Sequence, residues 1–318
     1  MSAIINFEKI VVPHQLQKFN KKKGNFQMEN DKNRRFRELL NRPGVLFAAG
    51  TYDCVSARIA EKCGFDAVYM SGNGITASLL GKPDIGLTSM SEMVLRGHQI
   101  ASCIDVPLLC DSDTGYGNIN NVYRTVQEYE AAGVSAIHLE DQITPKKCGA
   151  MEGLALIPAE EMVEKIQVAL SARKDPNFTI IARSDSAAVL GVDESIRRLK
   201  MYAAAGADVV FPEMIMTKED ILKVTTSVDA PVMFDILEQP PHQIFSVKEL
   251  EGLGIKIVFN CLSAMFFVCN QLTQFYGDLK ANGGYTGDYM NRMMPLHDYE
   301  ALMGLVEQNS LRERVCKK

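Results

Sequence analysis

The stretch NVYRTVQEYEAAGVSAIHLED, residues 121–141, decides the fold. Its first part, residues 121–133, places apolar side chains three and four positions apart, which predicts a helix. The glycine that ends this pattern suits a left-handed helix C-cap. Residues 136–141 then form a short apolar run that ends in two acids, which predicts a strand covered on both faces. The unit is a helix, a glycine stop and a strand with a polar end.

The same unit recurs along the chain, for example in AEKCGFDAV (residues 60–68) and AAGADVVF (residues 204–211). Short runs rich in Val, Ile, Leu and Phe predict eight strands, because they are too short for helices. These runs cover residues 45–50, 67–72, 106–111, 136–141, 179–185, 208–213, 231–237 and 256–261. Helical patterns cover residues 54–64, 121–133, 158–173 and 193–206.

Eight alternating strands and helices over ~250 residues are typical of a (β/α)8 TIM-type barrel, an α/β fold. A doubly wound open sheet is the alternative. It usually has fewer strands, and no G-x-G-x-x-G motif follows the first predicted strand. We therefore expect residues 1–33 to be an N-terminal extension and residues 34–318 to be a single barrel domain that ends in a helical segment.

The composition narrows the possible partners and compartments. The 318 residues are 47% hydrophobic and 23% charged, which is close to the average for globular proteins. A net charge of −5 and short basic clusters argue against a nucleic-acid partner. No apolar run reaches the ~18 residues of a membrane helix, and no signal peptide is visible, so we expect no membrane partner and a cytoplasmic location. Eight cysteines without a CxxC pair predict reduced thiols.

Polar side chains follow nearly every predicted strand. In a barrel of this type catalytic groups come from the C-terminal ends of the strands, so these side chains would share one face. Any single one is more often a helix cap or a turn former, but charges are rarely buried without partners, and the whole set predicts a site. The set contains Tyr69, Ser71, Gly72, Asn73, Asp111, Ser112, Asp113, Glu140, Asp141, Gln142, Arg183, Asp185, Glu213, Asp235, Glu238 and Asn260.

Three of these acids predict a metal site. Asp111 and Asp113 lie two positions apart, and in an extended segment they would point the same way. Glu140 from the neighbouring strand would bring a third carboxylate. Three carboxylates cannot all stay ionised together without a cation, and hard oxygen ligands favour Mg²⁺ or Mn²⁺. His138 is expected to be a neutral core side chain, and the chain has no histidine cluster that would favour zinc.

Cys148 raises a separate question. It lies in DQITPKKCGAMEG (residues 141–153), with Lys146 and Lys147 before it and Gly149 after it. It is either an ordinary buried thiol or a tuned acid, and the stretch alone does not decide between them.

Seven ordered motifs resemble the isocitrate lyase and phosphoenolpyruvate mutase superfamily, over about residues 36 to 300. Within it the chain is most similar to the methylisocitrate lyase and 2,3-dimethylmalate lyase type. The motifs are YMSGNG (69–74), GKPDIG (81–86), DSDTGYGN (111–118), HLEDQ (138–142), PKKCG (145–149), IIARSDS (180–186) and VVFPE (209–213).

The resemblance implies an α/β barrel whose last helix packs on a neighbouring subunit in a homotetramer. It implies Mg²⁺ near Asp111, with Asp113, Glu140 and Asp84 helping through water. It also implies roles for the remaining site residues. Ser71, Gly72 and Asn73 would hold a keto or hydroxy carboxylate, with Tyr69 beside the reacting oxygen. Arg183 would pair with a substrate carboxylate, Glu213 would support the site, and Gly149 and Asp235 would contact substrate.

The implied reaction is the metal-dependent cleavage of a C–C bond in carboxylic acid metabolism. A 2-hydroxy diacid, methylisocitrate-like or alkylmalate-like, would give a keto acid and a carboxylate. Cys148, on a loop that closes over the substrate, would protonate the carbanion, and Lys146 and Lys147 would lower its pKa. The partner is then a small di- or tricarboxylate.

Several positions depart from the pattern of methylisocitrate lyases. Ala150 and Leu154 stand where that pattern has His and Lys, Asp235 replaces Asn, Leu237 replaces Thr, and Phe266 replaces a substrate-binding Arg. A smaller or more apolar diacid, such as an alkylated malate, fits these changes better than a tricarboxylate.

Three alternatives remain at this stage. The same scaffold could support an oxaloacetate hydrolase or decarboxylase, or a phosphonate enzyme of the phosphoenolpyruvate mutase type. A non-catalytic binding protein is a third hypothesis. The resemblance implies that lyases and oxaloacetate hydrolases carry the KKCG loop, whereas the mutase, phosphonopyruvate hydrolase and simple decarboxylase members generally lack it. The loop therefore favours C–C cleavage of a hydroxy- or oxo-diacid.

Overall fold

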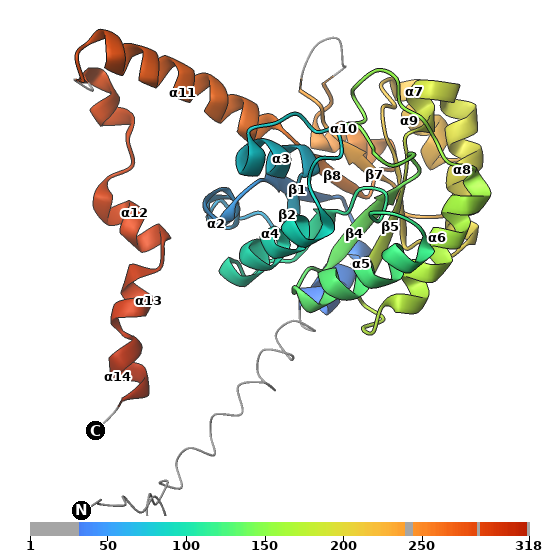
Figure 1. Ribbon diagram of the computed structural model, residues 1–318, viewed down its shortest axis with the longest axis horizontal. Coiled ribbons are helices and arrows are strands. Elements are labelled where there is room, and N and C mark those ends of the chain that lie inside the picture. Colours follow the sequence, from blue (N-terminus) through green and yellow to red (C-terminus); the bar gives the residue numbers. More distant parts are fainter. Residues whose placement is uncertain (1–31, 239–243, 285–286, 317–318) are drawn as a thin grey trace, which may run out of the picture.

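The computed structural model describes residues 32–238, 244–284 and 287–316, and it has a parallel barrel at its centre (Figure 1). The strands pair in the order β6-β5-β4-β3-β2-β1-β8-β7. Val210 of β6 forms a parallel bridge with Val232 just before β7, so the sheet is nearly closed. The strands are β1 (Leu46–Thr51), β2 (Ala67–Met70), β3 (Leu108–Asp111), β4 (Ala136–Glu140), β5 (Thr179–Ser184), β6 (Val209–Pro212), β7 (Met233–Asp235) and β8 (Ile257–Asn260).

All eight predicted strands and the barrel are confirmed. The barrel helices form an outer layer around the sheet (Figure 1). They are α2 (Cys54–Lys62), α3 (Gly72–Leu80), α4 (Met90–Cys103), α5 (Ile119–Ala131), α6 (Ala159–Ala172), α7 (Ser186–Leu190), α8 (Val192–Ala204), α9 (Lys218–Thr225) and α10 (Val247–Gly252). The four predicted helices correspond to α2, α5, α6 and α8.

The glycine stops have the expected conformation. Gly64, Gly133 and Gly206 have φ values of 90°, 82° and 102°, respectively. Residues with a side chain rarely adopt such positive φ values, so glycine lets each helix end and the chain turn directly into the next strand.

The core has two layers. Apolar side chains pack between the strands and the outer helices, and a second cluster fills the barrel interior, where Tyr69, Phe211 and Phe259 are at most 1% exposed. A helix over residues 32–41 closes the N-terminal end of the barrel by burying Phe36 in the interior cluster. The predicted boundary between residues 33 and 34 falls within this helix. The rest of the predicted extension, residues 1–31, lies outside the described residues.

The C-terminal helices leave the barrel as an arm (Figure 1). Helix α11 projects outward and carries no buried side chain, although its sequence is rich in apolar residues. Arg58 of α2 donates a hydrogen bond to the backbone oxygen of Leu302, 3.0 Å away, and so ties the arm to the barrel. No helix within the described ranges is both long enough and apolar enough to cross a membrane. The arm comprises α11 (Ser263–Ala281), η2 (Gly287–Arg292), α12 (Leu296–Leu302), α13 (Leu305–Asn309) and α14 (Leu311–Val315).

Candidate active site

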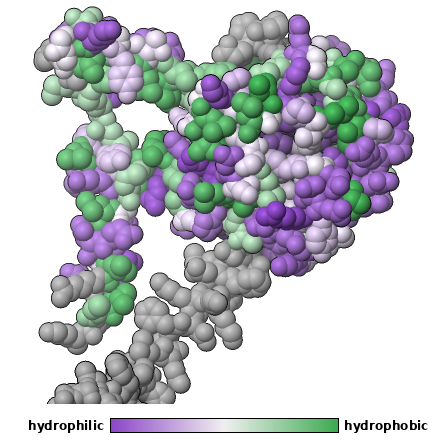
Figure 2. Space-filling model, viewed as in Figure 1, coloured by the Kyte–Doolittle hydropathy of each residue, from purple (hydrophilic) through white to green (hydrophobic). Residues whose placement is uncertain are grey.

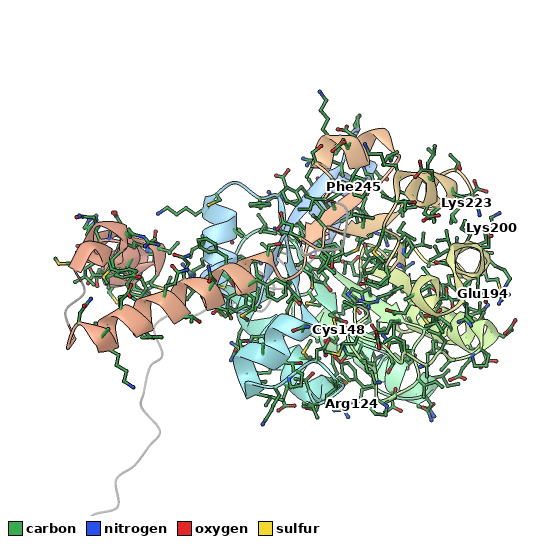
Figure 3. All side chains as sticks on the ribbon, turned by 90° about the horizontal axis from the view of Figure 1, so that it is seen from above. Arg124, Cys148, Glu194, Lys200, Lys223 and Phe245 are labelled. Carbon is green, nitrogen blue, oxygen red and sulfur yellow. The ribbon has the colours of Figure 1, made fainter. Side chains whose placement is uncertain are left out.

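A cavity of about 290 Å³ lies at the C-terminal ends of the strands, where a barrel of this type carries its site. In Figure 3 Cys148 lies over the middle of the barrel, whereas Arg124, Glu194 and Lys223 lie on its outer helices. The structure places in the cavity wall most of the residues with a predicted catalytic, substrate-binding or metal-binding role: Tyr69, Asn73, Asp84, Asp111, Lys146, Cys148, Gly149, Arg183, Glu213 and Asp235. The other four, Ser71, Gly72, Asp113 and Glu140, are absent from the wall.

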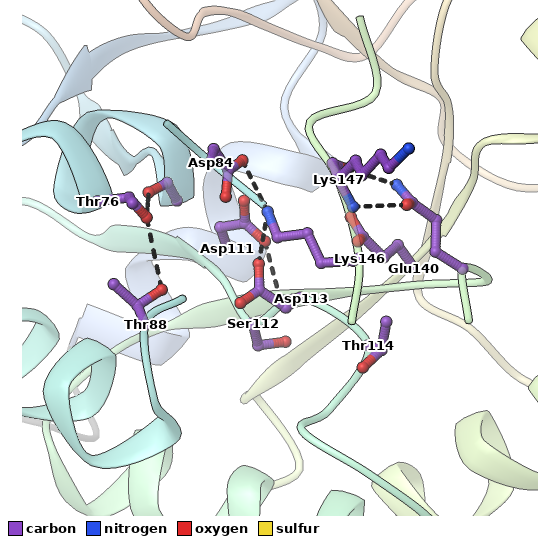
Figure 4. A network of polar contacts seen from close by, with 12 residues as sticks. Thr76, Asp84, Thr88, Asp111, Ser112, Asp113, Thr114, Glu140, Lys146 and Lys147 are labelled. Atoms are coloured by element: carbon purple, nitrogen blue, oxygen red, sulfur yellow. Dashed lines mark hydrogen bonds and ion pairs between the residues drawn. The ribbon is translucent and has the colours of Figure 1, made fainter. Parts of the chain in front are cut away.

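Lys146 lies among the predicted metal-binding acids (Figure 4). Its buried Nζ atom donates to Oδ2 of Asp84 at 2.8 Å and lies 2.8 Å from Oδ1 of Asp113. Burial alone would lower the pKa of Lys146, but Asp113, Asp111 and the other acids raise it well above its ordinary value. The lysine is therefore a fixed positive charge that holds the acids together.

Asp111 has a pKa below its ordinary value. Burial opposes its ionisation, yet the nearby His138, Lys146 and Arg183 bring its pKa down to about 2. Burial lowers the pKa of His138 to about 4, so at pH 7 its ring is neutral and the two cations carry the effect. The neutral core histidine agrees with the sequence-based expectation, and its Nε2 atom lies 2.7 Å from the Tyr69 hydroxyl.

Asp111 and Asp113 do come together, but for a different reason than predicted. The segment is not extended there, because Asp113 has a φ of 48° and its backbone amide donates to Oδ1 of Asp111 at 2.9 Å. This local turn lets the side chain accept a backbone hydrogen bond, which aspartate readily does in turns. Burial raises the pKa of Asp113 to about 6, and Asp111 adds to the rise while Lys146 opposes it.

The acids fit a hard divalent cation by chemistry. Both side-chain oxygens of Glu140 are buried without a hydrogen bond, although Oε2 lies 3.4 Å from Nε of Arg183. Burial raises the pKa of Glu140 well above its ordinary value, and Arg183 opposes the rise. Carboxylate oxygens that form no hydrogen bond can act as ligands of Mg²⁺. Across the described ranges, no three Asp, Glu, His or Cys side chains are already arranged to hold a metal ion. The carboxylate oxygens that could bind a metal ion are therefore present, and Nζ of Lys146 lies between Asp84 and Asp113.

Arg183 forms the second charged group of the cavity. Its Nε and Nη2 atoms donate to the two oxygens of Asp185 at 3.0 and 2.7 Å, respectively. The remaining fork atom, Nη1, faces Oε2 of Glu213 at 3.6 Å. Burial raises the pKa of Glu213 to about 6, although Arg183 opposes the rise. A substrate carboxylate could therefore reach Nη1 beside a glutamate that is easily protonated.

The Cys148 loop lies over the cavity. The backbone amide of Cys148 donates to the backbone oxygen of Asp84 at 3.0 Å, which fixes the loop to the segment after α3. Gly149 comes so close to the charged groups that a Cβ atom there would lie 2.5 Å from Arg183 Nη2 and 2.6 Å from Glu213 Cγ. Only glycine permits this approach, so the KKCG motif also has a steric meaning.

The prediction that both lysines lower the pKa of Cys148 is wrong. Lys146 is directed to the acids, and Nζ of Lys147 lies 3.2 Å from the backbone oxygen of Gly153, to which it donates. Burial raises the pKa of the Cys148 thiol above 9.0, while hydrogen bonds to the Ala150 backbone and the Asn73 side chain oppose the rise. The group is therefore a protonated thiol near neutral pH, which suits a proton donor better than a nucleophile.

Residues 71–73 (Ser-Gly-Asn) form the start of α3. Ser71 caps this helix by accepting from the amide of Gly74 at 3.1 Å, and its hydroxyl lies 2.9 Å from Sγ of Cys261. Gly72 packs against Asp111, where a Cβ atom would lie 2.4 Å from Oδ2. Asn73 is the member that lines the cavity, so the segment presents the helix start and one amide side chain to a ligand.

Asp141 and Asp185 were expected among the strand-end side chains, but the buried network that they form behind Arg183 with Arg198 and Tyr202 was not predicted. Asp185, which clamps Arg183, has its own backbone amide held by Oδ1 of Asp141 at 2.9 Å. The other oxygen of Asp141 accepts from Tyr202 at 2.7 Å and from Arg198 at 3.0 Å. The signal was faint, because Arg198 and Tyr202 lie on α8, far along the chain from Asp141. Asp141 itself ends a predicted strand.

The apolar part of the wall also includes residues that the prediction did not assign a role. Cys261 directly follows the eighth strand, so its position in the sequence could have suggested it, but the search for charged side chains passed over it. Phe266, noted for its departure from the family pattern, does line the cavity and is 41% exposed. The apolar and sulfur-bearing wall residues are Ala150, Met151, Leu237, Phe259, Cys261, Leu262 and Phe266.

Comparison with known proteins agrees with this geometry. The sequence model of the family "phosphoenolpyruvate phosphomutase" matches residues 36–275. The chain is 39% identical to 2,3-dimethylmalate lyase of Eubacterium barkeri, over 85% of this chain and 93% of that protein. It is 37% identical to 2-methylisocitrate lyase of Shewanella oneidensis, over 85% of this chain and 92% of that protein.

Two solved structures show the same architecture. Oxaloacetate acetylhydrolase in complex with the inhibitor 3,3-difluorooxalacetate superposes with a TM-score of 0.85 at 29% identity, over 92% of this chain and 98% of that one. Phosphonopyruvate hydrolase in complex with oxalate and Mg²⁺ gives 0.81 at 29% identity, over 90% and 99%. The family match, the lyase relatives and the shared barrel together show that the chain belongs to the phosphoenolpyruvate mutase/isocitrate lyase superfamily.

Proposed function

We propose that this carbon–carbon lyase cleaves a 2-hydroxy diacid of the alkylmalate kind into a keto acid and a carboxylate, with Mg²⁺ as its cofactor. The observation that carries the proposal is the protonated thiol of Cys148 on a loop that lies over buried acids and Arg183. A reaction that breaks a C–C bond next to a carboxylate produces a carbanion, and a carbanion needs an acid within the closed site.

Different residues would bind the metal ion and the second carboxylate at the two ends of the cavity. Asp111, with Asp113, Glu140 and Asp84, would hold Mg²⁺, and the bound ion would lower the pKa of the substrate hydroxyl as a Lewis acid. Asn73 and the start of α3 lie next to these acids and would orient the first carboxylate. Nη1 of Arg183 would bind the second carboxylate.

Cys148 would then complete the reaction. The proton of the substrate hydroxyl would pass to an ionised carboxylate of the site as the C–C bond breaks. The Cys148 thiol would transfer its own proton to the carbon that has lost the keto acid. When the loop opens, the thiol would regain a proton from solvent and the carboxylate would release one to it. Gly149 brings the loop close enough to Arg183 and Glu213 to exclude water while the carbanion exists.

The apolar wall favours a substrate with alkyl groups. Leu237, Leu262 and Phe266 line the cavity without adding a cation. A third carboxylate there would lose its hydration without gaining a partner, which is costly, whereas methyl groups would be favoured. An alkylated malate therefore fits this wall better than a tricarboxylate.

A substrate panel tests the proposal. Purified protein would be incubated with malate, 2,3-dimethylmalate and 2-methylisocitrate, each with Mg²⁺ and with an excess of chelator, and keto-acid release would be measured. We expect release that requires Mg²⁺ and is fastest with dimethylmalate. Absence of release from every substrate would reject the proposal.

Oxaloacetate hydrolysis is the second candidate, because the structure of oxaloacetate acetylhydrolase superposes so closely on this chain. Oxaloacetate in the same assay distinguishes the reactions by their products. Oxalate and acetate would identify a hydrolase, pyruvate a decarboxylase, and unchanged oxaloacetate would favour the lyase.

We also propose that the arm packs on a second copy of this chain within a homotetramer. Phe267 and Tyr276 of α11 are 67% and 60% exposed, and further apolar side chains on η2 and α12–α14 are exposed as well. Figure 2 shows hydrophobic patches among hydrophilic ones along the arm, away from the barrel. Exposed apolar surface of this extent is typical of an interface.

A further inference from the structure

Asp235 is a carboxyl group of the cavity that the reaction described above does not use. It ends β7 and lines the cavity, and its Oδ1 atom accepts the backbone amide of Cys261 at 3.0 Å. Among the described residues, no lysine or arginine lies within ion-pair distance of Asp235. The cation of the cavity wall beside it, Arg183, is already held by Asp185 and faces Glu213. The second oxygen of Asp235 therefore lacks a cationic partner.

The groups that surround Asp235 disfavour its negative charge. Glu213, just after β6, and Glu238, after β7, are acids. Tyr69 on β2 and Cys261, just after β8, both have a pKa raised by burial and stay neutral. Arg183 on β5 acts in the opposite sense and favours the ionised form of Asp235. Burial and Glu213 raise the pKa of Asp235 well above 3.8, although the Cys261 amide and Arg183 oppose the rise.

An anionic substrate sharpens this conflict. A second carboxylate bound at Nη1 of Arg183 would lie in the same end of the cavity as Asp235 and Glu213. An ionised Asp235 would repel it, whereas a neutral carboxylic acid has an O–H that can donate to it. The two states of one side chain would thus have opposite effects on the same ligand.

We propose that Asp235 is a specificity residue that binds as a neutral acid and donates a hydrogen bond to the second carboxylate of the substrate. The inference rests on the proposed function, because it takes the substrate to be a dicarboxylate. It also explains why the cavity can do without a second arginine at Phe266: one arginine and one protonated acid hold a single carboxylate, and no group remains for a third.

The proposal fixes the sign of a pH effect. The favourable hydrogen bond is present while Asp235 is protonated, and it is lost as pH rises through the pKa of Asp235 in the free protein. Above that pKa, binding requires uptake of one proton, so affinity falls about tenfold for each further pH unit. An asparagine at this position has nearly the same shape and donates at every pH.

Binding of a dicarboxylate that cannot be cleaved tests this directly. Titration calorimetry with succinate in the presence of Mg²⁺ would be run from pH 6 to pH 9 on the natural protein and on Asp235→Asn. Glu238→Gln serves as the matched control, since it removes a nearby acid from outside the cavity wall. Glyoxylate, which has one carboxylate, serves as the control ligand, and the thermal midpoint of each variant would verify folding.

We expect the natural protein and Glu238→Gln to lose at least tenfold more succinate affinity across this range than Asp235→Asn, and glyoxylate to show no such difference. If succinate affinity depends on pH in the same way in all three proteins, this inference is wrong, but the proposed function is not affected. Failure of all three proteins to bind any dicarboxylate would overturn the proposed function together with it. Unfolding of Asp235→Asn at pH 7 would also overturn it, because it would make Asp235 a structural residue.

Discussion

The chemistry of this site depends on individual residues, and Gly149 shows how little space the packing leaves. Its backbone approaches Arg183, Glu213 and Asp185 so closely that a Cβ atom would fall within 2.7 Å of an atom of each residue. The substitution Gly149→Ala should therefore hold the loop away from the cavity. A displacement of about 1 Å in a catalytic loop can reduce turnover about 100-fold.

Steady-state kinetics would measure this effect. Gly252→Ala is the matched control, because a Cβ atom at Gly252 would meet nothing within 4 Å. We expect Gly252→Ala to keep full turnover and Gly149→Ala to lose most of it. Equal turnover of the two variants would show that the loop does not close as described.

Cys148 gives a second prediction at this scale. A serine hydroxyl is a far weaker acid than a thiol, so Cys148→Ser should reduce kcat by about 10²- to 10⁴-fold, while Cys63→Ser on the surface should have no effect. Since burial raises the pKa of Cys148 above 9.0, the donor stays protonated at neutral pH, and kcat should decline only above pH 9.0. A decline that starts below pH 8, and that Cys148→Ser leaves unchanged, would assign the acid to another group.

The sequence predicted which residues form the site better than it predicted their electrostatic surroundings and protonation. Tyr69, Asp111 and Arg183 were recognisable because each is a polar side chain within or at the end of a predicted apolar strand. The electrostatics of Cys148 was predicted wrongly, because neighbours in sequence need not be neighbours in space. Lys146 turns to Asp84 and Asp113, and Lys147 turns to backbone oxygens of its own loop.

Helix α8 contributes to the site from outside the barrel. Tyr202 and Arg198 on this helix hold Asp141, and Asp141 in turn holds the backbone of Asp185 beside Arg183. Tyr202→Phe removes one of the donors to this buried carboxylate. A hydrogen bond to a charged group contributes about 1.5–3 kcal/mol, so we expect a loss of stability near the lower end of that range, since other donors remain.

Denaturant unfolding would measure that loss, and kcat/KM would show whether Arg183 has shifted. We expect an increase in KM with little change in kcat, because Arg183 binds substrate and Asp141 only positions it. Tyr123→Phe removes an exposed hydroxyl from α5 and serves as the control. An unchanged KM in Tyr202→Phe would limit this network to a structural role.

The elements differed in how well they could be predicted. Strands that are buried on both faces leave a clear apolar signature, and the glycine stops mark their beginnings. The position of the arm could be expected only from the resemblance, because the apolar residues of α11 have no partner within the barrel. The turn at Asp113 was also missed, since its left-handed backbone leaves no mark in the sequence except a short DSD motif.

At the scale of the whole molecule, the arm predicts self-association. Replacing Phe267 and Tyr276 with Asp would place charges on the exposed apolar face of α11. We expect the natural protein to sediment as a tetramer and this double variant to shift toward smaller species. Leu222→Asp, an equally drastic change on α9 at the opposite side of the barrel in Figure 1, should leave the assembly intact. A natural protein that sediments as a monomer at micromolar concentration would contradict the proposed interface.

The central claim is that this barrel breaks a C–C bond and that a protein acid then protonates the released carbon. The most direct measurement is the mass of the carboxylate product after turnover of 2,3-dimethylmalate with Mg²⁺ in D₂O. The account predicts one equivalent of keto acid and a carboxylate product carrying one deuterium at the carbon of the broken bond, delivered by Cys148 after its proton exchanges with solvent. Formation of no keto acid, or of a carboxylate product without deuterium at that carbon, would contradict it.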